Sequence, residues 1–480
     1  MLMSTPAHLP ESIMPPVRFL TSSILIPLGL AACSISSQQS PNSTPLPAAW
    51  KNAGAFPVVS PTQDLTRWWS RFDDPVLTRL ISGTLKNNPD ILSAVARIQE
   101  SRARRNAEAA SLFPFIGGSV SSNFRNTQSD FSGNNSSTSY SAGLDASWEA
   151  DVFGKRRNIV AAATANLGAA EENLHSVQAA LAAEVAISYS NLRATEARLV
   201  VLRRNVKTRE QSSQLASWRQ QAGEADSLES SQAYSSLEQA RAGVPALEQI
   251  ASQTRNQLAL LSGRVPGSLD STLSSSDGIP TPERGLAIGI PADTVRQRPD
   301  VRIAGYQVLA AAANTRSADA ARFPSLNLSG SLGLNSLSAG KIFNPETTSA
   351  NLIAGITSPI FDAGRIRANI EAFTAAEQQA VQVYRSTVLT ALSETEDALI
   401  ACRRSAERLT LLEKATTAAR EANDLAQQRY QAGEIDFFIV LDAQRTLLGL
   451  EDNLISTRTD RTIAYIQLYK ALGGGWSQNR

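Results

Sequence analysis

The residue types that most often carry out chemistry in proteins are scarce in this chain of 480 residues. It has two histidines, His8 and His175, and two cysteines, Cys33 and Cys402, and none of them belongs to a CxxC or CxxH motif. His175 lies in a helical pattern without a neighbour that would complete a catalytic pair or a metal site, so we expect an exposed helix residue. Cys402 lies on an apolar helical stripe, where a free cysteine is typically a small buried hydrophobe. The sequence therefore indicates a protein that is not an enzyme and that binds neither a metal nor a dissociable cofactor.

The surroundings of Cys33 predict a covalent modification rather than catalysis. Residues 14–33 read MPPVRFLTSSILIPLGLAAC, in which Arg18 precedes an apolar stretch that is too short to span a bilayer as a helix of ~20 residues. The small residues before Cys33 resemble a bacterial lipobox. In a lipobox the sulfur receives a diacylglyceryl group, the chain is cleaved before the cysteine, and the freed amine is acylated. An ordinary signal peptide with a chance cysteine is the alternative interpretation.

The lipobox divides the N-terminal region into two segments. We expect a signal peptide in residues 1–32 and a lipidated tether, rich in Ser, Pro, Gln and Asn, in residues 33–63. Met14 is an alternative start to Met1, because no basic residue precedes it. Several acyl chains would anchor the protein firmly to a membrane, since one chain alone binds only marginally.

Composition and charge exclude two further classes of protein. The formal net charge is +1 with neutral histidines, and no run rich in Lys or Arg occurs, which argues against a general nucleic-acid binder. Aromatic residues make up 6% of the chain and its content of glycine and proline is modest, so it is not a disordered chain.

The chain contains two copies of one unit, separated by a constant offset of 210 residues. Several short motifs recur in this register, namely Asn88-Pro89-Asp90 as Arg298-Pro299-Asp300, Phe113-Pro114 as Phe323-Pro324, Gly154-Lys155 as Gly364-Arg365, and Gln221-Ala222-Gly223-Glu224 as Gln431-Ala432-Gly433-Glu434. This period is far longer than that of solenoid repeats. We therefore expect a first repeat in residues 64–262, a non-helical linker in 263–292, a second repeat in 293–474 and a short tail in 475–480.

Each repeat is predicted to contain two strands, at about residues 116–126 and 138–150 and at about 325–336 and 350–361. Apolar and polar residues alternate in these segments, and the alternation keeps its parity across the offset of 210 residues. Such segments are typical of transmembrane β-barrels, although a half-buried strand pair of a soluble sheet gives a similar pattern. Four strands cannot close a barrel in lipid, and an open sheet edge would leave backbone groups unpaired. Several copies of the chain must then share one barrel.

Two very long helical hairpins are predicted in residues 153–262 and 363–473. The first helix of each hairpin lacks proline over more than 60 residues and would be ~100 Å long at 1.5 Å per residue. Its apolar residues recur every three or four positions, and much of the remainder is Ala, Ser, Thr, Gln and Glu. Gly223 and Gly433 fit the turns in which the chain reverses, because glycine adopts a positive φ at little cost. These segments predict antiparallel coiled hairpins.

Taken together, these residues resemble the TolC/OprM family of outer-membrane factors, in particular its lipidated, NodT-like efflux branch. The resemblance covers nearly the whole chain after Cys33. It rests on the opening Trp68-Trp69, Phe72, Asp74-Pro75 and Asn88-Pro89-Asp90, on the midpoint Arg298-Pro299-Asp300-Val301 and Arg322-Phe323-Pro324-Ser325-Leu326, and on Arg429-Tyr430-Gln431-Ala432-Gly433 with Leu441-Asp442-Ala443-Gln444-Arg445 near the end.

The resemblance implies a mixed α+β membrane protein that is mainly helical. It implies a homotrimer, with a twelve-stranded outer-membrane β-barrel to which each protomer contributes four strands. A long periplasmic α-helical barrel of antiparallel coiled hairpins would continue this β-barrel. An equatorial belt is expected around residues 263–292 and the C-terminus. The position of Ser34 after the lipidated cysteine implies sorting to the outer membrane.

The resemblance also implies a periplasmic gate and a docking site. Asp442 matches a gate carboxylate of the family and Tyr430 a tyrosine of its gate network, and three Asp442 side chains around one axis would repel one another and attract cations. Ile435 and Ile439 stand where some members have an arginine and a second aspartate, so we expect apolar gate contacts from Phe437, Phe438 and Ile439. A solvated or capping role is the alternative for Asp442, and a core position is the alternative for Phe437 and Phe438. The hairpin tips, where an adaptor protein would dock, are marked by Gln221, Gly223, Gln431 and Gly433.

The function implied is that of the exit duct of a tripartite efflux system for drugs or other small toxic compounds. Its partners would be a periplasmic membrane-fusion adaptor and an inner-membrane pump of the resistance-nodulation-division (RND) type. A duct for type I protein secretion shares this architecture and remains an alternative. A structural coiled-coil lipoprotein of the envelope, without a pore, is a second alternative.

Overall fold

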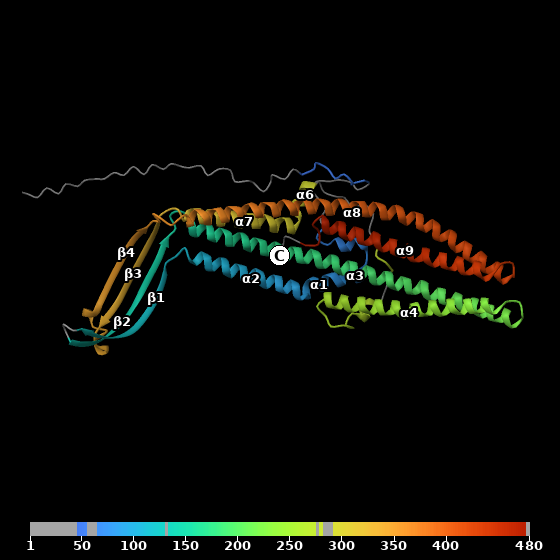
Figure 1. The fold of residues 1–480 in the computed structure, drawn as a ribbon, viewed down its shortest axis with the longest axis horizontal. Coiled ribbons are helices and arrows are strands. Elements are labelled where there is room, and N and C mark those ends of the chain that lie inside the picture. Colours follow the sequence, from blue (N-terminus) through green and yellow to red (C-terminus); the bar gives the residue numbers. More distant parts are fainter. Residues whose placement is uncertain (1–45, 55–64, 130–132, 275–277, 282–290, 477–480) are drawn as a thin grey trace, which may run out of the picture. The chain divides into compact units, whose positions relative to one another are not determined.

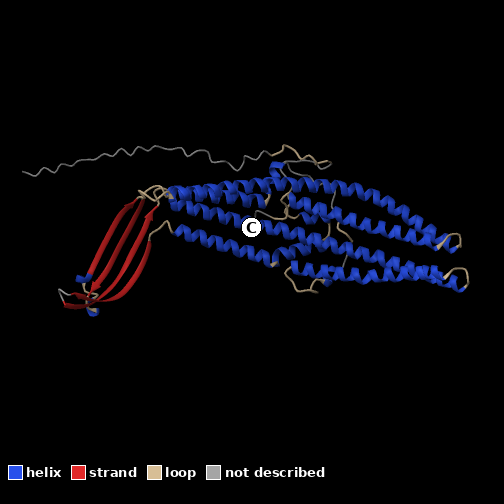
Figure 2. Ribbon diagram, viewed as in Figure 1, coloured by secondary structure: helices blue, strands red, loops and turns tan. Residues whose placement is uncertain are grey.

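The computed structural model describes residues 46–54, 65–129, 133–274, 278–281 and 291–476. Cys33, the expected signal peptide and most of the expected tether lie outside the described residues, as does part of the expected linker. The described residues belong to one compact unit within residues 41–480. In that unit the helices lie side by side along one axis, and a sheet projects from one end of them (Figures 1 and 2).

The described part of the chain is mainly helical with four antiparallel strands, which confirms the predicted fold class. The order of elements is η2 Trp68–Phe72, α1 Pro75–Asn87, α2 Pro89–Ala110, β1 Phe115–Ser129, β2 Gly133–Ala150, α3 Lys155–Gln221, α4 Ser227–Leu261, α5 Asp270–Leu273, α6 Pro291–Gln297, α7 Pro299–Ala320, β3 Ser325–Ser336, η3 Ala339–Lys341, η4 Pro345–Thr347, β4 Thr348–Thr357, α8 Arg365–Gln431 and α9 Phe437–Ala471. No helix in the described ranges is both long and apolar enough to cross a membrane.

Three strands differ in length from the expectation, and β1 ends at Ser129 rather than near 126. β2 begins at Gly133 rather than near 138, because its polar first residues continue the ladder with the equally polar end of β1. β4 ends at Thr357 rather than near 361. Pro359 follows two residues later, and proline has no N–H to donate to a ladder.

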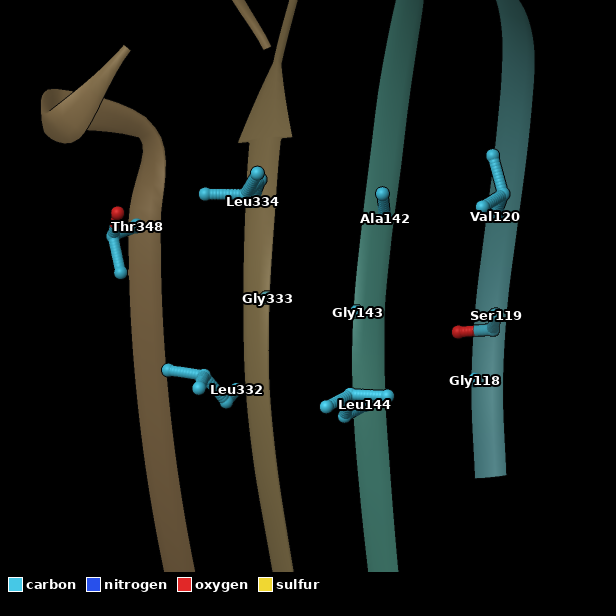
Figure 3. A pocket seen from close by; sticks show the side chains of 10 residues that line it. All are labelled: Gly118, Ser119, Val120, Ala142, Gly143, Leu144, Leu332, Gly333, Leu334 and Thr348. Atoms are coloured by element: carbon cyan, nitrogen blue, oxygen red, sulfur yellow. The ribbon is translucent and has the colours of Figure 1, made fainter. Parts of the chain in front are cut away.

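The sheet separates apolar from polar side chains, as the alternation predicts. Its strand order is β1-β2-β3-β4, and the register places Leu144 opposite Gly118 on one side and opposite Leu332 on the other. Leu144, Leu332 and Leu334 line an exposed apolar depression of about 460 Å³ on this face (Figure 3). The opposite face carries polar contacts, including a hydrogen bond of 2.7 Å between the hydroxyls of Ser121 and Ser141.

The main apolar core lies around the middle of the helices, where α1, α3 and α9 meet. Trp68 stacks on Tyr469 with ring centroids 5.3 Å apart, and both side chains are buried. Asp74 caps α1 by accepting hydrogen bonds from the backbone N–H groups of Val76 and Leu77, and its other oxygen accepts one from the hydroxyl of Tyr189 at 2.8 Å. These contacts hold the short N-terminal helix against α3.

The long helices repeat one design twice. α3 and α8 each have 67 residues and α4 and α9 each have 35, and within each pair the second helix follows a short turn. α4 continues through Pro245, which lies in the interior of the helix. Cys402 of α8 is buried and free, and burial raises the pKa of its thiol to about 12, as fits a cysteine that acts as a small hydrophobe.

Gly263, which follows α4, is a position where we expect a large loss of stability on substitution. Its φ is +65°, and a Cβ built there would lie 2.5 Å from the carbonyl oxygen of Asn87. Gly263→Ala should therefore lower the free energy of unfolding by about 1–3 kcal/mol, because both the backbone strain and the clash oppose the native turn. The loss should appear in the midpoint of urea unfolding of the helical signal.

The matched control for this prediction is Gly223→Ala. Gly223 has a φ of +78°, but nothing lies within 4 Å of its Cβ position, so only the left-handed backbone opposes alanine. That substitution should cost about 1 kcal/mol or less. Equal losses at both glycines would contradict the proposed role of the contact with Asn87.

Candidate functional site

The end of the helices opposite the sheet is formed by two hairpin turns with the same geometry (Figure 1). Gly223 and Gly433 both have a φ of +78°, and the backbone N–H groups of Glu224 and Glu434 donate to carbonyl oxygens five residues earlier at 2.9 Å. This is the hydrogen-bond pattern of a glycine-terminated helix. Gln221, Gly223, Gln431 and Gly433 are all exposed, so the structure places these four predicted residues on the surface of the tips.

A small apolar cluster, the tip cluster, lies directly behind the turns. Its buried members come from all four long helices and are Ala216, Ala233, Ala426, Tyr430, Phe437, Val440 and Leu441. The rings of Tyr430 and Phe437 are 5.3 Å apart at an angle of 50°. The tip cluster is separate from the main core, so the turns rest on a few side chains of their own.

A polar link joins the two hairpins beside the tip cluster. The hydroxyl of Tyr430, at the end of α8, donates a hydrogen bond to Glu229 Oε1 in the first turn of α4. The Arg219 guanidinium of α3 lies 3.7 Å from the same carboxylate oxygen and 5.0 Å from the centre of the Tyr430 ring. Burial, followed by the neighbouring Glu229 carboxylate, raises the pKa of Tyr430 to about 12, so this phenol is protonated and donates at neutral pH.

The sequence predicted Tyr430 but missed both of its partners. Glu229 is 201 residues from Tyr430, and Arg219 belongs to no motif. The duplication contained one signal that could have identified Glu229. The offset of 210 residues pairs Glu229 with Ile439, so the carboxylate exists in the first repeat alone, and Tyr430 itself corresponds to Gln220. A difference between otherwise matched copies marks a position where they have separate roles.

The other residues predicted for this site face outward. Asp442, Phe438 and Ile439 are exposed, and Asp442 has no hydrogen bond or ion pair with any residue that the structure describes. The cap position of α9 is Asp436, so Asp442 is not a capping residue. Phe437 is 2% exposed and Phe438 66%, so Phe437 belongs to the tip cluster and only Phe438 is free to contact another chain.

His175 differs from the expectation of an exposed helix residue. Its ring stacks on Trp476 at 4.3 Å, and its Nδ1 lies 3.1 Å from Glu172, which also accepts from Arg302 at 2.7 Å. The reason is tertiary, because the C-terminal segment crosses α3 at this point and covers the imidazole. No group of three or more His, Cys, Asp or Glu side chains suited to a metal occurs in the part of the chain that the structure describes.

Comparison with protein families and known proteins gives consistent results. The model of the family described as outer membrane efflux protein matches residues 80–264 and again residues 290–474. The two matches correspond to the two repeats of the chain and together cover most of it.

Similar proteins match over nearly their full lengths. The chain is 33% identical to the pyoverdine export outer membrane protein OpmQ of Pseudomonas aeruginosa over 460 residues, which cover 94% of this chain and 96% of OpmQ. It is 32% identical to the toluene efflux pump outer membrane protein TtgF of Pseudomonas putida, over 95% of this chain and 96% of TtgF. The solved structure of the outer-membrane channel OprN superposes with a TM-score of 0.86 at 31% identity and covers 92% of this chain and 100% of that one.

Proposed function

Since this chain belongs to the outer membrane efflux protein family and is the outer-membrane channel of an efflux pump, we propose that three copies of it form one exit duct. Each copy would contribute β1 to β4 to a shared barrel of twelve strands, and its four long helices to a tunnel through the periplasm. The copies would meet at β1 and β4, the two outer strands of the sheet.

The observation that supports this proposal most directly is the pair of open sheet edges. β1 pairs only with β2 and β4 only with β3 among the described residues, so each outer strand presents unpaired backbone groups. The sheet also exposes one apolar face, whose residues include Val120, Leu352 and Ile356. Unpaired backbone groups are strongly unfavourable in lipid, and pairing β4 of one copy with β1 of the next removes them.

The test of the proposed trimer is the mass of the full-length protein purified in a mild detergent. Native mass spectrometry should give three chains per particle, and particles added to a planar bilayer should conduct ions. A monomeric, non-conducting particle would contradict the shared barrel. The same measurement distinguishes a duct from an envelope lipoprotein without a pore.

We further propose that Cys33 carries the lipid anchor and that the mature chain begins with this residue. Cys33→Ala should abolish incorporation of labelled palmitate, whereas Cys402→Ala should leave it unchanged, because the Cys402 thiol is buried in α8. The measurement is labelling in growing cells, followed by isolation of the protein. Labelling that survives Cys33→Ala would place the lipid elsewhere or show that no lipobox is used.

The proposed cargo is small organic compounds. The names of OpmQ and TtgF give pyoverdine and toluene as the compounds that those proteins or their pumps export. Two such different molecules indicate that the duct itself imposes little chemical selectivity. We assign energy supply and selection of cargo to an inner-membrane pump of the RND type, reached through a periplasmic membrane-fusion adaptor. The adaptor would dock on the exposed tips around Gly223 and Gly433.

The polar link between Tyr430, Glu229 and Arg219 is proposed to hold the periplasmic end closed. It joins the hairpin of the second repeat to that of the first, so the hairpins cannot separate at the tips without breaking it. Exposed Asp442, Phe438 and Ile439 would line the closed entrance in the trimer. An adaptor opens such an entrance only if it binds the open state more tightly than the closed one.

A further inference from the structure

The ion pairs between the two helices of the first hairpin include Arg255 with Glu196 at 2.8 Å and Arg219 with Glu229 at 3.7 Å. Two further pairs lie one heptad apart in one register. Arg203 of α3 donates to Glu248 of α4 at 2.7 Å, and Arg241 of α4 donates to Glu210 of α3 at 2.8 Å. The members are seven residues apart on each helix, so they lie one heptad apart on the same side of the hairpin. Their side chains are about half exposed, so they contribute little to the core.

The second hairpin has two ion pairs at the same positions with every charge reversed. Arg458 of α9 donates to Glu413 of α8 at 3.2 Å, and Arg420 of α8 donates to Glu451 of α9 at 2.8 Å. The offset of 210 residues pairs each of these residues with one of the first hairpin. The duplication has therefore preserved the positions of the pairs while it inverted the sign of all four members in one copy relative to the other.

The apolar packing in the coiled part of the first hairpin specifies register only weakly. The buried residues of α4 in this part are small apart from one leucine: Ala233, Ser236, Leu237 and Ala240. In the same stretch α3 buries Arg209 and Ala216, and the Arg209 guanidinium donates to the backbone oxygen of Ser236 at 3.0 Å. This buried contact favours the native register, and the small residues around it add little to that preference. In coiled hairpins of this kind, flanking charges can set the register that the interior leaves open.

Shifting α4 along α3 by one heptad would bring like charges together, whichever way α4 moves. One direction places Arg203 opposite Arg241. The other direction places Glu210 opposite Glu248 and Arg203 opposite Arg255. Like charges at such positions destabilise a pairing by about as much as opposite charges stabilise it.

The charge reversal also disfavours pairing between a helix of one repeat and a helix of the other. If α9 took the place of α4 beside α3, Arg203 would face Arg458 and Glu210 would face Glu451. The native contact between the repeats uses a different residue, since Arg204, one position further along α3, donates to Glu451 at 2.6 Å. Glu451 is 6% exposed and thus joins α3, α8 and α9.

We propose that these eight residues form a pairing code, which fixes the antiparallel register of each long hairpin and rejects a helix of the other repeat as a partner. The eight residues are Arg203, Glu210, Arg241 and Glu248 in the first hairpin and Glu413, Arg420, Glu451 and Arg458 in the second. Duplication produces two hairpins of equal length whose helices compete for the same partners. The charges add to a difference between the interiors, since α9 buries Phe437 and Val440 near the tips whereas α4 buries Ala233 and Ser236.

The decisive variant is R203E/E210R, which exchanges the two charges of α3 without changing the net charge. In the native register both pairs become like-charged. In a register shifted by one heptad, the new glutamate at position 203 would face Arg255 and the new arginine at position 210 would face Glu248, so both contacts would be attractive. We expect an about tenfold lower ratio of folded to unfolded protein, from two lost attractions and two new repulsions. The readout is urea unfolding of the full-length protein in detergent, followed by its helical signal.

A second readout reports the register itself. Leu202 and Gly243 contact each other in the native hairpin, so L202C/G243C in a Cys402→Ala background should be joined by a short bis-maleimide. The yield of this crosslink should fall several-fold when R203E/E210R is added. The same background without the engineered pair gives the baseline.

The matched rescue is the further exchange R241E/E248R on α4. All four charges of the first hairpin are then inverted, both pairs are restored, and stability and crosslinking should return to those of the parent protein. In the second hairpin E413R/R420E should be equally harmful, but its rescue by E451R/R458E should be incomplete, because position 451 would then repel Arg204.

Either of two outcomes in the first hairpin would overturn the pairing code, and a third, in the second hairpin, would overturn half of it. If R203E/E210R unfolds and crosslinks like the parent protein, the charges are solvated surface groups without influence on pairing. If R241E/E248R fails to rescue it, the loss comes from the individual positions rather than from their pairing. Complete rescue in the second hairpin would show that Glu451 does not join the repeats. It would thereby contradict the proposal that the code rejects a helix of the other repeat.

Discussion

Leu332→Arg is expected to abolish formation of the membrane-inserted oligomer. Leu332 lies within β3, on the apolar face of the sheet, beside Leu144 and Leu334 (Figure 3). If this face meets lipid, an arginine there costs about 2–4 kcal/mol near the bilayer midplane, and a trimer carries it three times. That penalty is comparable to the whole stability of many folded proteins, which is roughly 5–15 kcal/mol. Heat-resistant oligomer in the outer-membrane fraction should fall below detection on gels.

The matched control is Ser331→Arg, one residue earlier on the same strand. Ser331 points to the polar face and is paired in the register with Asp145 of β2. An arginine at this position would lie toward the interior of the barrel, where water and a carboxylate can receive it. This variant should assemble like the parent protein. Loss of assembly with both arginines, or with neither, would contradict the assignment of the two faces.

The arrangement of the sheet is the part of the fold that local sequence predicts best. A residue such as Leu332 alternates with Ser331 and Gly333, and a period of two residues determines which face each side chain joins. The offset of 210 residues then transfers the pattern from one repeat to the other. The long hairpins were predicted for a similar reason, since the absence of proline and the glycines at positions 223 and 433 are local signals.

The contacts of single side chains across the molecule are the part that the sequence does not predict. Tyr430 contacts Glu229 only because the end of α8 lies beside the start of α4. The periodicity within one helix does not predict how two hairpins are aligned. His175 provides a second example. Its pattern on α3 is that of a surface residue, but Trp476 near the C-terminus packs over it. Asp442 shows the converse, since its predicted role depends on other copies of the chain rather than on contacts within one.

Tyr430→Phe is expected to increase the conductance of the closed channel. Phenylalanine keeps the ring beside Phe437 and beneath the Arg219 guanidinium, so the tip cluster retains its packing. It removes the hydroxyl that donates to Glu229, leaving that carboxylate with Arg219 at 3.7 Å. A hydrogen bond to a charged group contributes about 1.5–3 kcal/mol, so the open state should become roughly ten- to a hundredfold more populated. Single-channel recording in planar bilayers measures that population as open probability.

The pH dependence of the same link has a predictable sign. Burial and the Glu229 carboxylate raise the pKa of Tyr430 from its ordinary 10.0 to about 12. Opening at the tips would break the link and expose the phenol, so we expect the pKa to return towards 10.0 and the closed state to favour the protonated phenol. The stabilisation is complete below pH 10 and is lost as the pH rises from 10 towards 12. Open probability should therefore increase over this interval in the parent protein but not in Tyr430→Phe.

The control for the gate is a second buried tyrosine that donates to a carboxylate far from the tips. Tyr189 of α3 donates to Asp74 at 2.8 Å in the main core, so Tyr189→Phe should lower the stability of the protein without changing its conductance. A further variant, Asp442→Ala, should reduce cation selectivity, because it removes the proposed acidic ring at the entrance. If Tyr189→Phe raised the conductance as much as Tyr430→Phe, the hairpins would open through a general loss of stability rather than at the tips. An unchanged selectivity in Asp442→Ala would remove Asp442 from the entrance while leaving the tyrosine link in place, since the two residues act through different contacts.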